Sequence, residues 1–395
     1  MSELNAATRG TQKKRALSLD LARGFMLLLI VLSHVPLFLY MIEPGVLTKV
    51  AGSTTLDHFL NFLMEIIVDN RARPLFAVLF GYGLVMIYRK QQERKGDKEA
   101  KRIIKRRCWY LILFGAVLAG VAGGQDILMT YGIAGLLLVS TLKKDNTKIK
   151  KYVIISILIC AIYIPFLWGG VLFENQSYGL LESVTGQETY FNTVLDRLIS
   201  IPIIPLFTHV FFPVIPSVLI GIWLGNLNIL IKPQPHLKLL KQLTIAGLSI
   251  SLLGAIPLVL INDFWFPSFF IAGVVYGIHV ITGFAAGIGY AALFGLLGVW
   301  IKKQGFIVKS IAALGKRSLT FFVIHEVSIV ILLSPIAFNL GAVLTVTTSV
   351  LIGILIWVVT LFTAYFMEHH QMSGPLEKYM RYLIYRHPTS NNAST

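Results

Sequence analysis

Three ionisable side chains fall on one face of the first apolar segment, where their types could do chemistry. Asp20, Arg23 and His34 are separated by three and eleven positions. On a helix of 3.6 residues per turn, Arg23 and His34 lie about 20° apart around the axis and roughly 16 Å apart along it. Asp20 falls near the same face, one turn before Arg23. Ionisable groups at such depth in an apolar segment are costly and usually face a protein interior, so the stripe predicts a functional site.

The chemistry that these residue types offer is acid–base catalysis and anion binding. A histidine such as His34 can act as a general base on a hydroxyl, and an arginine such as Arg23 binds phosphate or carboxylate. The structural alternative is that Asp20 and Arg23 cap the helix start, with the Arg23 side chain reaching toward water. His34 would then be a hydrogen-bonded polar residue near the other end of the segment. The alignment of the three favours the functional interpretation.

A second candidate site precedes the next apolar run. Asp69 and Arg73 are at i and i+4, and Glu65 is one turn earlier on that face, so we expect these charges to pair. Pro74 would kink the helix beside Arg73. Arg71 and Arg73 could stabilise an oxyanion or hold an anionic ligand, with Asp69 beside them. The alternative is an ion pair that only stabilises the kink.

A third candidate is the adjacent pair His325 and Glu326, which begins about 10 Å into its apolar run. The pair could relay protons or contact a substrate, or it could be a hydrogen-bonded buried pair. Asp126 is a weaker candidate, because the dipole alone favours an acidic residue at a helix N-terminus. His209 and His279 stand alone, and we expect them to be packing or hydrogen-bonded residues. No zinc spacing or nucleotide-binding glycine motif occurs, so neither a metal nor a resident cofactor is expected.

Composition places these residues in a polytopic membrane protein. The chain has 395 residues, of which 55% are hydrophobic and 14% are charged, whereas a soluble domain carries about a quarter charged residues. Several apolar runs approach or exceed the length that crosses a hydrocarbon core. The first run lacks the cleavage pattern of a secretory signal. Cys108 and Cys160 suggest neither a disulfide framework nor a metal cluster. We therefore expect an all-α transmembrane bundle.

The basic charges are distributed as a topology signal. Thirty of the 35 Lys and Arg residues fall in six segments that would lie on one side. Only Lys49 and Arg197 fall in the opposite loops, which is the positive-inside pattern. The net charge of +16 therefore does not indicate a nucleic-acid partner. The six segments are 1–19, 89–107, 143–151, 231–242, 299–317 and 368–395.

The apolar pattern predicts about ten spans with both termini in the cytoplasm. The expected spans are 20–42, 57–88, 108–122, 126–142, 152–172, 203–230, 243–262, 270–298, 318–338 and 345–367. The transmembrane domain, 20–367, lies between a basic N-terminal segment, 1–19, and a basic tail, 368–395. Within it, 89–107 is expected to be a cytoplasmic helix or loop. The outer region 173–200 is expected to form short interfacial structure.

The second span needs a helix longer than its charge-free part. Residues 74–88 give about 22 Å of helix, which is short for a core of roughly 30 Å. The charge topology requires a crossing here, so the helix should extend back to Asp57 and include Arg71 and Arg73. The alternative is that 57–70 lies along the outer surface as an amphipathic helix.

These residues resemble a known group of membrane proteins. The stretch Ser18-Leu19-Asp20-Leu21-Ala22-Arg23-Gly24 with His34 resembles the first-helix signature of the transmembrane acyltransferase superfamily. Over roughly residues 15–387 the chain is more similar to the YeiB-like family of uncharacterised bacterial membrane proteins. The stretches that carry this second resemblance are 73–83, Gly124-Gln125-Asp126-Ile127-Leu128, Leu314-Gly315-Lys316-Arg317-Ser318-Leu319-Thr320 and Gly374-Pro375-Leu376-Glu377. The resemblance implies that His34 is catalytic and that Arg23 binds or positions an acyl donor.

Two functions follow as hypotheses. The first is an acyltransferase of the cell membrane that moves an acyl group from cytosolic acyl-CoA, as co-substrate, to an envelope sugar or lipid. His34, Arg73 and His325 would then be catalytic. The residues expected to bind substrate are Asp20, Arg23, Asp69, Arg71, Asp126 and Glu326. The second is a transporter or flippase for a small anionic solute or lipid-linked molecule. A membrane scaffold or sensor is a third possibility, and the sequence leaves the oligomeric state open.

Overall fold

The computed structural model describes residues 16–40, 42, 45–47, 49–180, 186–261 and 263–385. Within these ranges the protein is all-helical, with two isolated bridges, Leu47 to Gly179 and Ile261 to Trp265, and no strand. Most of the basic N-terminal segment, 1–15, and the last ten residues of the tail, 386–395, lie outside the described residues.

Several helices are long and apolar enough to cross a membrane. Five reach that length, and a bent pair, α7 (Tyr190–Ser200) with α8 (Ile203–Phe211), makes up to six. The five candidates are Leu17–Phe38, Asn146–Asn175, Gln234–Leu260, Phe269–Trp300 and Val346–His369. The expectation of an all-α, multi-pass membrane protein is confirmed at this level. Length and composition of single helices support five or six spans, against about ten expected from the apolar pattern.

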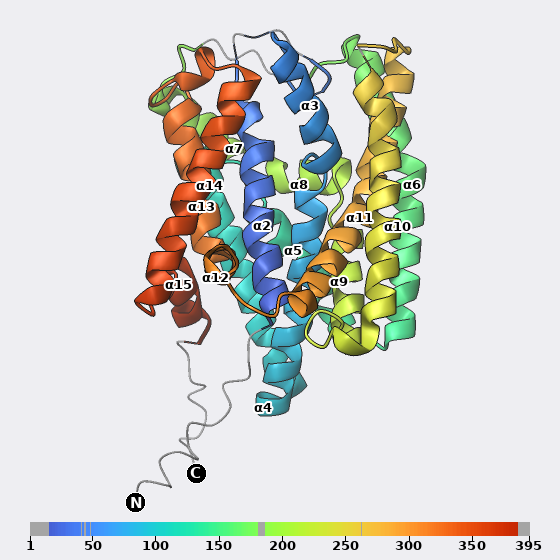
Figure 1. Ribbon diagram of the computed structural model, residues 1–395, viewed down its shortest axis with the longest axis vertical. Helices are drawn as coiled ribbons and strands as arrows, with labels where there is room; N and C mark the ends of the chain where they lie inside the picture. The colour runs from blue at the N-terminus through green and yellow to red at the C-terminus, as the bar shows by residue number, and fades with distance from the viewer. Residues whose placement is uncertain are drawn as a thin grey trace, which may run out of the picture.

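Helix α2 (Leu17–His34) is the central element of the bundle (Figure 1). Helix α12 packs closely against α2. Gly24 of α2 lies against Ile311, and Gly315 of α12 lies against the backbone of Asp20. Small residues at such contacts let helix backbones approach one another. The helices that contact α2 are α4 (Ala72–Val117), α11 (Phe269–Trp300), α12 (Phe306–Lys316), α13 (Ser318–Leu333) and α14 (Val346–His369).

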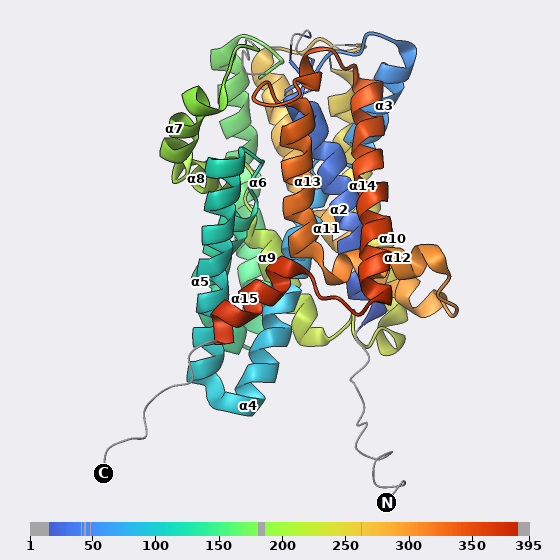
Figure 2. The same cartoon turned by 90° about the vertical axis from the view of Figure 1, so that its left-hand side faces the viewer.

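The segment labelled α4 is a helical hairpin. Gly96 interrupts it with φ 81° and ψ 172°, a conformation that costs other residues strain and glycine little. Asp97 accepts a hydrogen bond from Tyr88, which lies before the turn, and another from Lys101, which lies after it. The second half of α4 then packs against α5 (Leu128–Leu138), where Gly132 lies against Cys108 and Ile112. Figure 2 shows the turn protruding at the lower end of the bundle. The segment 89–107, expected as a helix or loop, is helical on both sides of this tight turn.

The second span is broken earlier than expected. Helix α3 (Thr55–Ile67) ends before α4 begins at Ala72, and Asn70 between them has φ 54°. The expected single helix with a kink at Pro74 is therefore wrong in this detail. Pro74 lies in the first turn of α4, where its missing N–H removes no helical hydrogen bond. The break is made by the left-handed conformation of Asn70, whose side-chain amide donates to the His279 carbonyl at 2.6 Å.

The expected span 203–230 is also two helices, α8 and α9 (Ile215–Leu227). Pro213 lies in the link and Pro216 lies in the first turn of α9, and a proline cannot continue a preceding helix without loss of a hydrogen bond. Helix α8 lies across the bundle behind α2 and α3 (Figure 1). The exposed side chains of α7 and α8 are largely apolar, and the most exposed of the large ones are Phe191, Leu195, Ile199, Ile203 and Leu206.

The remaining helices pack beside this centre. Helix α11 packs along α6 (Asn146–Asn175) and α10 (Leu237–Leu260), with Gly277 against Pro165 and Gly247 against Gly289. On the opposite side α13 and α14 lie together, with α15 (Pro375–Tyr385) at their lower end (Figure 2). The turn expected at Gly123 and Gly124 is present, where the π-helical segment η2 (Leu118–Ala122) ends with Gly123 at φ 77°.

Candidate functional site

A buried pair of His34 and Glu326 joins the end of α2 to the middle of α13. The His34 Nδ1 atom lies 2.6 Å from Oε1 of Glu326. The Glu326 side chain is fully buried, and the His34 side chain is 12% exposed. The other carboxylate oxygen of Glu326 accepts the backbone N–H of Gln125 at 3.1 Å. The carboxylate is therefore held from two sides, and it fixes the orientation of the imidazole.

The turn from Gly123 to Ile127 closes this site from the side of α5. A Cβ added to Gly124 would lie 3.0 Å from the Cβ of Glu326, so the chain passes close to the carboxylate. Asp126 follows and accepts the N–H groups of Leu128 and Met129, each at 2.9 Å. Asp126 therefore caps α5, and it is also an electrostatic neighbour of Glu326.

The hydrogen bond to Glu326 determines what the His34 ring can do. A carboxylate only accepts hydrogen bonds, so Nδ1 of a neutral His34 must carry the proton and donate it. The lone pair is then on Nε2, which has no hydrogen-bond partner among the described residues. An imidazole oriented in this way, with a carboxylate to stabilise the imidazolium, can accept a proton from a hydroxyl.

His325 faces a different helix. Its Nε2 lies 2.7 Å from Oγ1 of Thr360 on α14, and that hydroxyl donates to the Trp357 carbonyl. The ring is fully buried, and its Nδ1 has no partner among the described residues. The structure thus places His325 against α14, whereas its neighbour Glu326 faces α2.

Arg23 and Asp20 lie toward the N-terminal end of α2. Arg23 Nη1 is 3.8 Å from Oδ1 of the buried Asp20, and the Arg23 side chain is 24% exposed. Gly83 of α4 lies beside the guanidinium. Eleven residues of helix, or about 16 Å, separate Arg23 from His34.

Arg71 is part of a buried polar network at the break between α3 and α4. The side chain is 1% exposed. Its guanidinium donates to the Asp69 carbonyl at 2.5 Å and to the Ser251 carbonyl at 3.0 Å, and it lies 3.2 Å from Nε2 of His279. The expectation that His279 is hydrogen-bonded is therefore confirmed.

Lys49 completes the network and changes the expected pairing. It forms ion pairs with Glu65 and, at 3.0 Å, with Asp69. Glu65 in turn lies 3.1 Å from Nε2 of His279. The expected pair of Asp69 with Arg73 is wrong, because the helix breaks between these residues and their i, i+4 geometry is lost.

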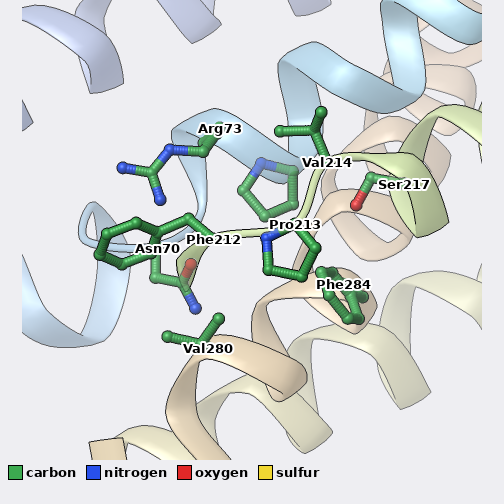
Figure 3. A pocket seen from close by; sticks show the side chains of 9 residues that line it. Asn70, Arg73, Phe212, Pro213, Val214, Ser217, Val280 and Phe284 are labelled. Atoms are coloured by element: carbon green, nitrogen blue, oxygen red, sulfur yellow. The ribbon is translucent and has the colours of Figure 1, made fainter. Parts of the chain in front are cut away.

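Arg73 has other surroundings, although it is two residues from Arg71. Its guanidinium carbon lies 4.2 Å from the ring centroid of Phe212. Its side chain makes no hydrogen bond or ion pair with any described residue. Arg73 lines a small pocket between α4, α9 and α11 together with Asn70 and Ser217 (Figure 3). Among the described residues, Arg73 is in contact with neither His34 nor His325.

The structure thus brings together His34, Glu326 and Asp126. It also pairs Asp20 with Arg23 and Asp69 with Arg71, each pair at another place in the bundle. Sequence reasoning did not predict that Glu326 orients His34, because 292 positions separate the two. It also missed Lys49, Phe212 and Ser217. Among the described residues, no three His, Cys, Asp or Glu side chains are grouped so that they could hold a metal ion.

The fold and the site define a multi-pass, all-helical membrane protein with a histidine–carboxylate pair inside the bundle. Residues 224–387 match the model of a family described as protein of unknown function (DUF418), which confirms the resemblance to the YeiB-like family. The matched part contains Glu326 and His325 but not α2 with His34.

A relative with a similar sequence is the uncharacterized protein YxaH of Bacillus subtilis (strain 168). It is 26% identical over 222 residues, which are 51% of this chain and 54% of YxaH. The chain therefore spans about half the length of the curated relative that it matches.

Proposed function

We propose that the protein is a membrane acyltransferase in which His34, oriented by Glu326, is the general base. The observation that carries this proposal is the 2.6 Å contact between His34 Nδ1 and Glu326, which leaves Nε2 available. A hydroxyl or amine of the acceptor attacks the thioester carbonyl of acyl-CoA while His34 Nε2 takes its proton. The carbon–sulfur bond breaks, and the proton returns from His34 to the CoA thiolate. The products are the acylated acceptor and free CoA.

The donor is proposed to enter from the inner end of α2. Arg23 would bind an anionic part of acyl-CoA, and the thioester arm would extend along α2 toward His34. Glu326 is then a positioning residue for His34, and Asp126 shapes the turn beside it. The acceptor in this proposal is a sugar or lipid of the envelope. In this proposal Arg71 and Asp69 contribute to substrate binding through their hydrogen-bonded network between α3 and α4.

The proposal includes ten crossings of the cell membrane with both termini in the cytoplasm. The asymmetry of Lys and Arg supports it. The segments 89–107, 143–151, 231–242 and 299–317, which carry many of these charges, lie toward the lower end of the bundle in Figure 1. The shorter apolar helices Leu128–Lys143, Ile215–Leu227 and Ser318–Leu333 would supply further crossings beyond the five long ones.

The first test is calorimetric binding of acetyl-, succinyl- and palmitoyl-CoA to the full chain in nanodiscs. We expect saturable binding of one acyl-CoA, loss of that binding in Arg23→Ala, and no loss in Arg94→Ala, which changes an exposed arginine near the inner turn. Release of free CoA thiol in the presence of an envelope extract then measures transfer. His34→Gln should retain binding but lower CoA release by about 10²- to 10⁴-fold. Equal release from His34→Gln and wild type would refute the role of His34.

A second candidate function is transport of a small anionic solute or lipid-linked molecule. It is favoured by the two ionisable pairs, Asp20–Arg23 and His34–Glu326, at different depths along α2. If none of the three acyl-CoA molecules binds, flux into proteoliposomes becomes the decisive measurement. Transport that depends on His34 would support this second function.

A further inference from the structure

One exposed face of the second half of α4 changes from charged to apolar along its length. Arg102 and Lys105 are exposed, and Trp109 follows one turn later. Leu113 and Val117, which are also exposed, continue at intervals of four residues. Residues three or four apart share a helix face, so these side chains form one stripe. Tryptophan gathers where the hydrocarbon of a membrane meets the headgroups, so Trp109 marks that level on α4.

Helix α15 lies beside this stripe and spans the same level. The Arg106 guanidinium donates to the Ile384 carbonyl, near the C-terminal end of α15, at 2.5 Å. Toward the other end of α15, the Tyr379 ring stacks on Phe114 of α4, with centroids 6.1 Å apart. On α4 these two contacts lie on either side of Trp109. Helix α15 therefore slants across the boundary between headgroups and hydrocarbon, as its course in Figure 2 illustrates.

The outward face of α15 has the composition of a surface in the headgroup layer. Met380 and Ile384 are buried, which fixes the face that packs on the bundle. Lys378, Tyr382 and Tyr385 follow one another at intervals of four and three residues on the opposite face, and all are exposed. Tyrosine has an apolar ring and a polar tip, and it is enriched at the headgroup level for that reason.

The basic side chains at this level are not balanced by carboxylates. Lys378 and Arg381 of α15 are exposed, and neither forms an ion pair with a described residue. Arg107 of α4 interacts electrostatically with Glu377, yet it makes no ion pair within the described ranges. The Glu377 carboxylate is instead occupied by backbone N–H groups and a hydroxyl in the first turn of α13. The surface therefore presents an excess of positive charge.

We propose that α15 and the adjoining face of α4 bind an anionic phospholipid in the leaflet at the lower end of the bundle. Lys378 and Arg381 contact the phosphate and the net negative charge of the headgroup. The acyl chains lie along Leu113 and Val117, which a soluble anion would leave uncovered. The surface is separate from His34 and Glu326, and it is argued without reference to acyl transfer.

The first test measures lipid binding to the full chain, delipidated in a neutral detergent, by native mass spectrometry. Phosphatidylglycerol is titrated against phosphatidylcholine with the same acyl chains. We expect saturable binding of phosphatidylglycerol at a concentration at which phosphatidylcholine binds weakly. The double variant Lys378→Gln with Arg381→Gln should weaken this binding about 25-fold, because each basic side chain near an anionic lipid surface contributes about fivefold.

A matched double variant separates this surface from the general basic charge of the protein. Lys150→Gln with Lys151→Gln removes two exposed lysines at the start of α6 and should bind phosphatidylglycerol as the wild type does. The proposal is overturned if the two phospholipids bind equally well, if the α15 double variant binds like the wild type, or if both double variants lose affinity equally.

A second measurement tests the depth of α15 even if its double variant fails to fold. A spin label on Tyr382→Cys in nanodiscs should be more accessible to oxygen than to a water-soluble nickel chelate. The same label on Lys98→Cys, in the exposed turn of α4, should show the reverse. The two native cysteines are buried, so they should take up little label. A label at position 382 as accessible to the chelate as that at position 98 would place α15 in water and overturn the proposal.

Discussion

At the scale of residues, Arg71 and Arg73 show that two arginines two positions apart can have very different surroundings. Arg71 is buried and bonded to Asp69, Ser251 and His279. Arg73 stacks on Phe212 without an ionic partner among the described residues. The sequence presents both as arginines before an apolar run, and only the break of the helix directs them to different sides.

The bonded network of Arg71 predicts that its loss destabilises the protein. Arg71→Ala should lower the free energy of unfolding by about 3–5 kcal/mol, because it leaves buried groups of the network unpaired. Arg71→Lys should recover little of this, since one ammonium cannot reproduce the spread of guanidinium bonds. Thermal unfolding in detergent would measure the change, with Arg94→Ala as the exposed control. A wild-type unfolding temperature in Arg71→Ala would contradict the network.

His325 gives a second prediction at this scale. Because its ring is bonded to Thr360 on α14, His325→Gln should reduce stability but leave CoA release within a few-fold of wild type. Thr360→Val, which removes the hydroxyl partner, should cost about 1–3 kcal/mol. The same two measurements, unfolding and CoA release, separate the outcomes. A loss of release as large as that of His34→Gln would instead make His325 part of the catalytic group.

At the scale of elements, the apolar pattern predicted several helices well. The expected spans 243–262, 270–298 and 345–367 lie within a few residues of α10, α11 and α14, because each is one uninterrupted apolar run. The break before α4 could not be predicted in this way. It depends on Asn70, whose partner His279 is 209 positions away. The pairing of His34 with Glu326 is equally distant in sequence, so no local spacing reveals it.

The close contact of α4 and α9 predicts a sharp glycine requirement. Gly81→Ala should separate the two helices and destabilise the protein by about 1–3 kcal/mol, as overpacking does, because its Cβ would collide with the Val218 carbonyl. Gly170→Ala on α6 is the matched control, because the added Cβ would meet no described atom of another element within 4 Å. That variant should be neutral or slightly stabilising. Equal unfolding temperatures for the two variants would argue against the close contact.

At the scale of the whole molecule, the proposed topology can be tested by labelling. The two native cysteines are buried, so they should give little background with an impermeant maleimide. Asp263→Cys, between α10 and α11, should be labelled in intact cells. Lys98→Cys, in the turn of α4, should be labelled only after the membrane is permeabilised. Both positions are exposed, and the reverse pattern would invert the topology.

The stripe along α2 also sets a length requirement on ligands. Asp20 with Arg23 and His34 with Glu326 are held on one straight helix, about 16 Å apart, and neighbouring helices fix both ends. A single ligand that touches both ends must be at least that long when extended. A short free acid, such as acetate, can occupy one end only. Under the proposed function, the acyl group would therefore have to arrive on a carrier long enough to reach both ends of α2.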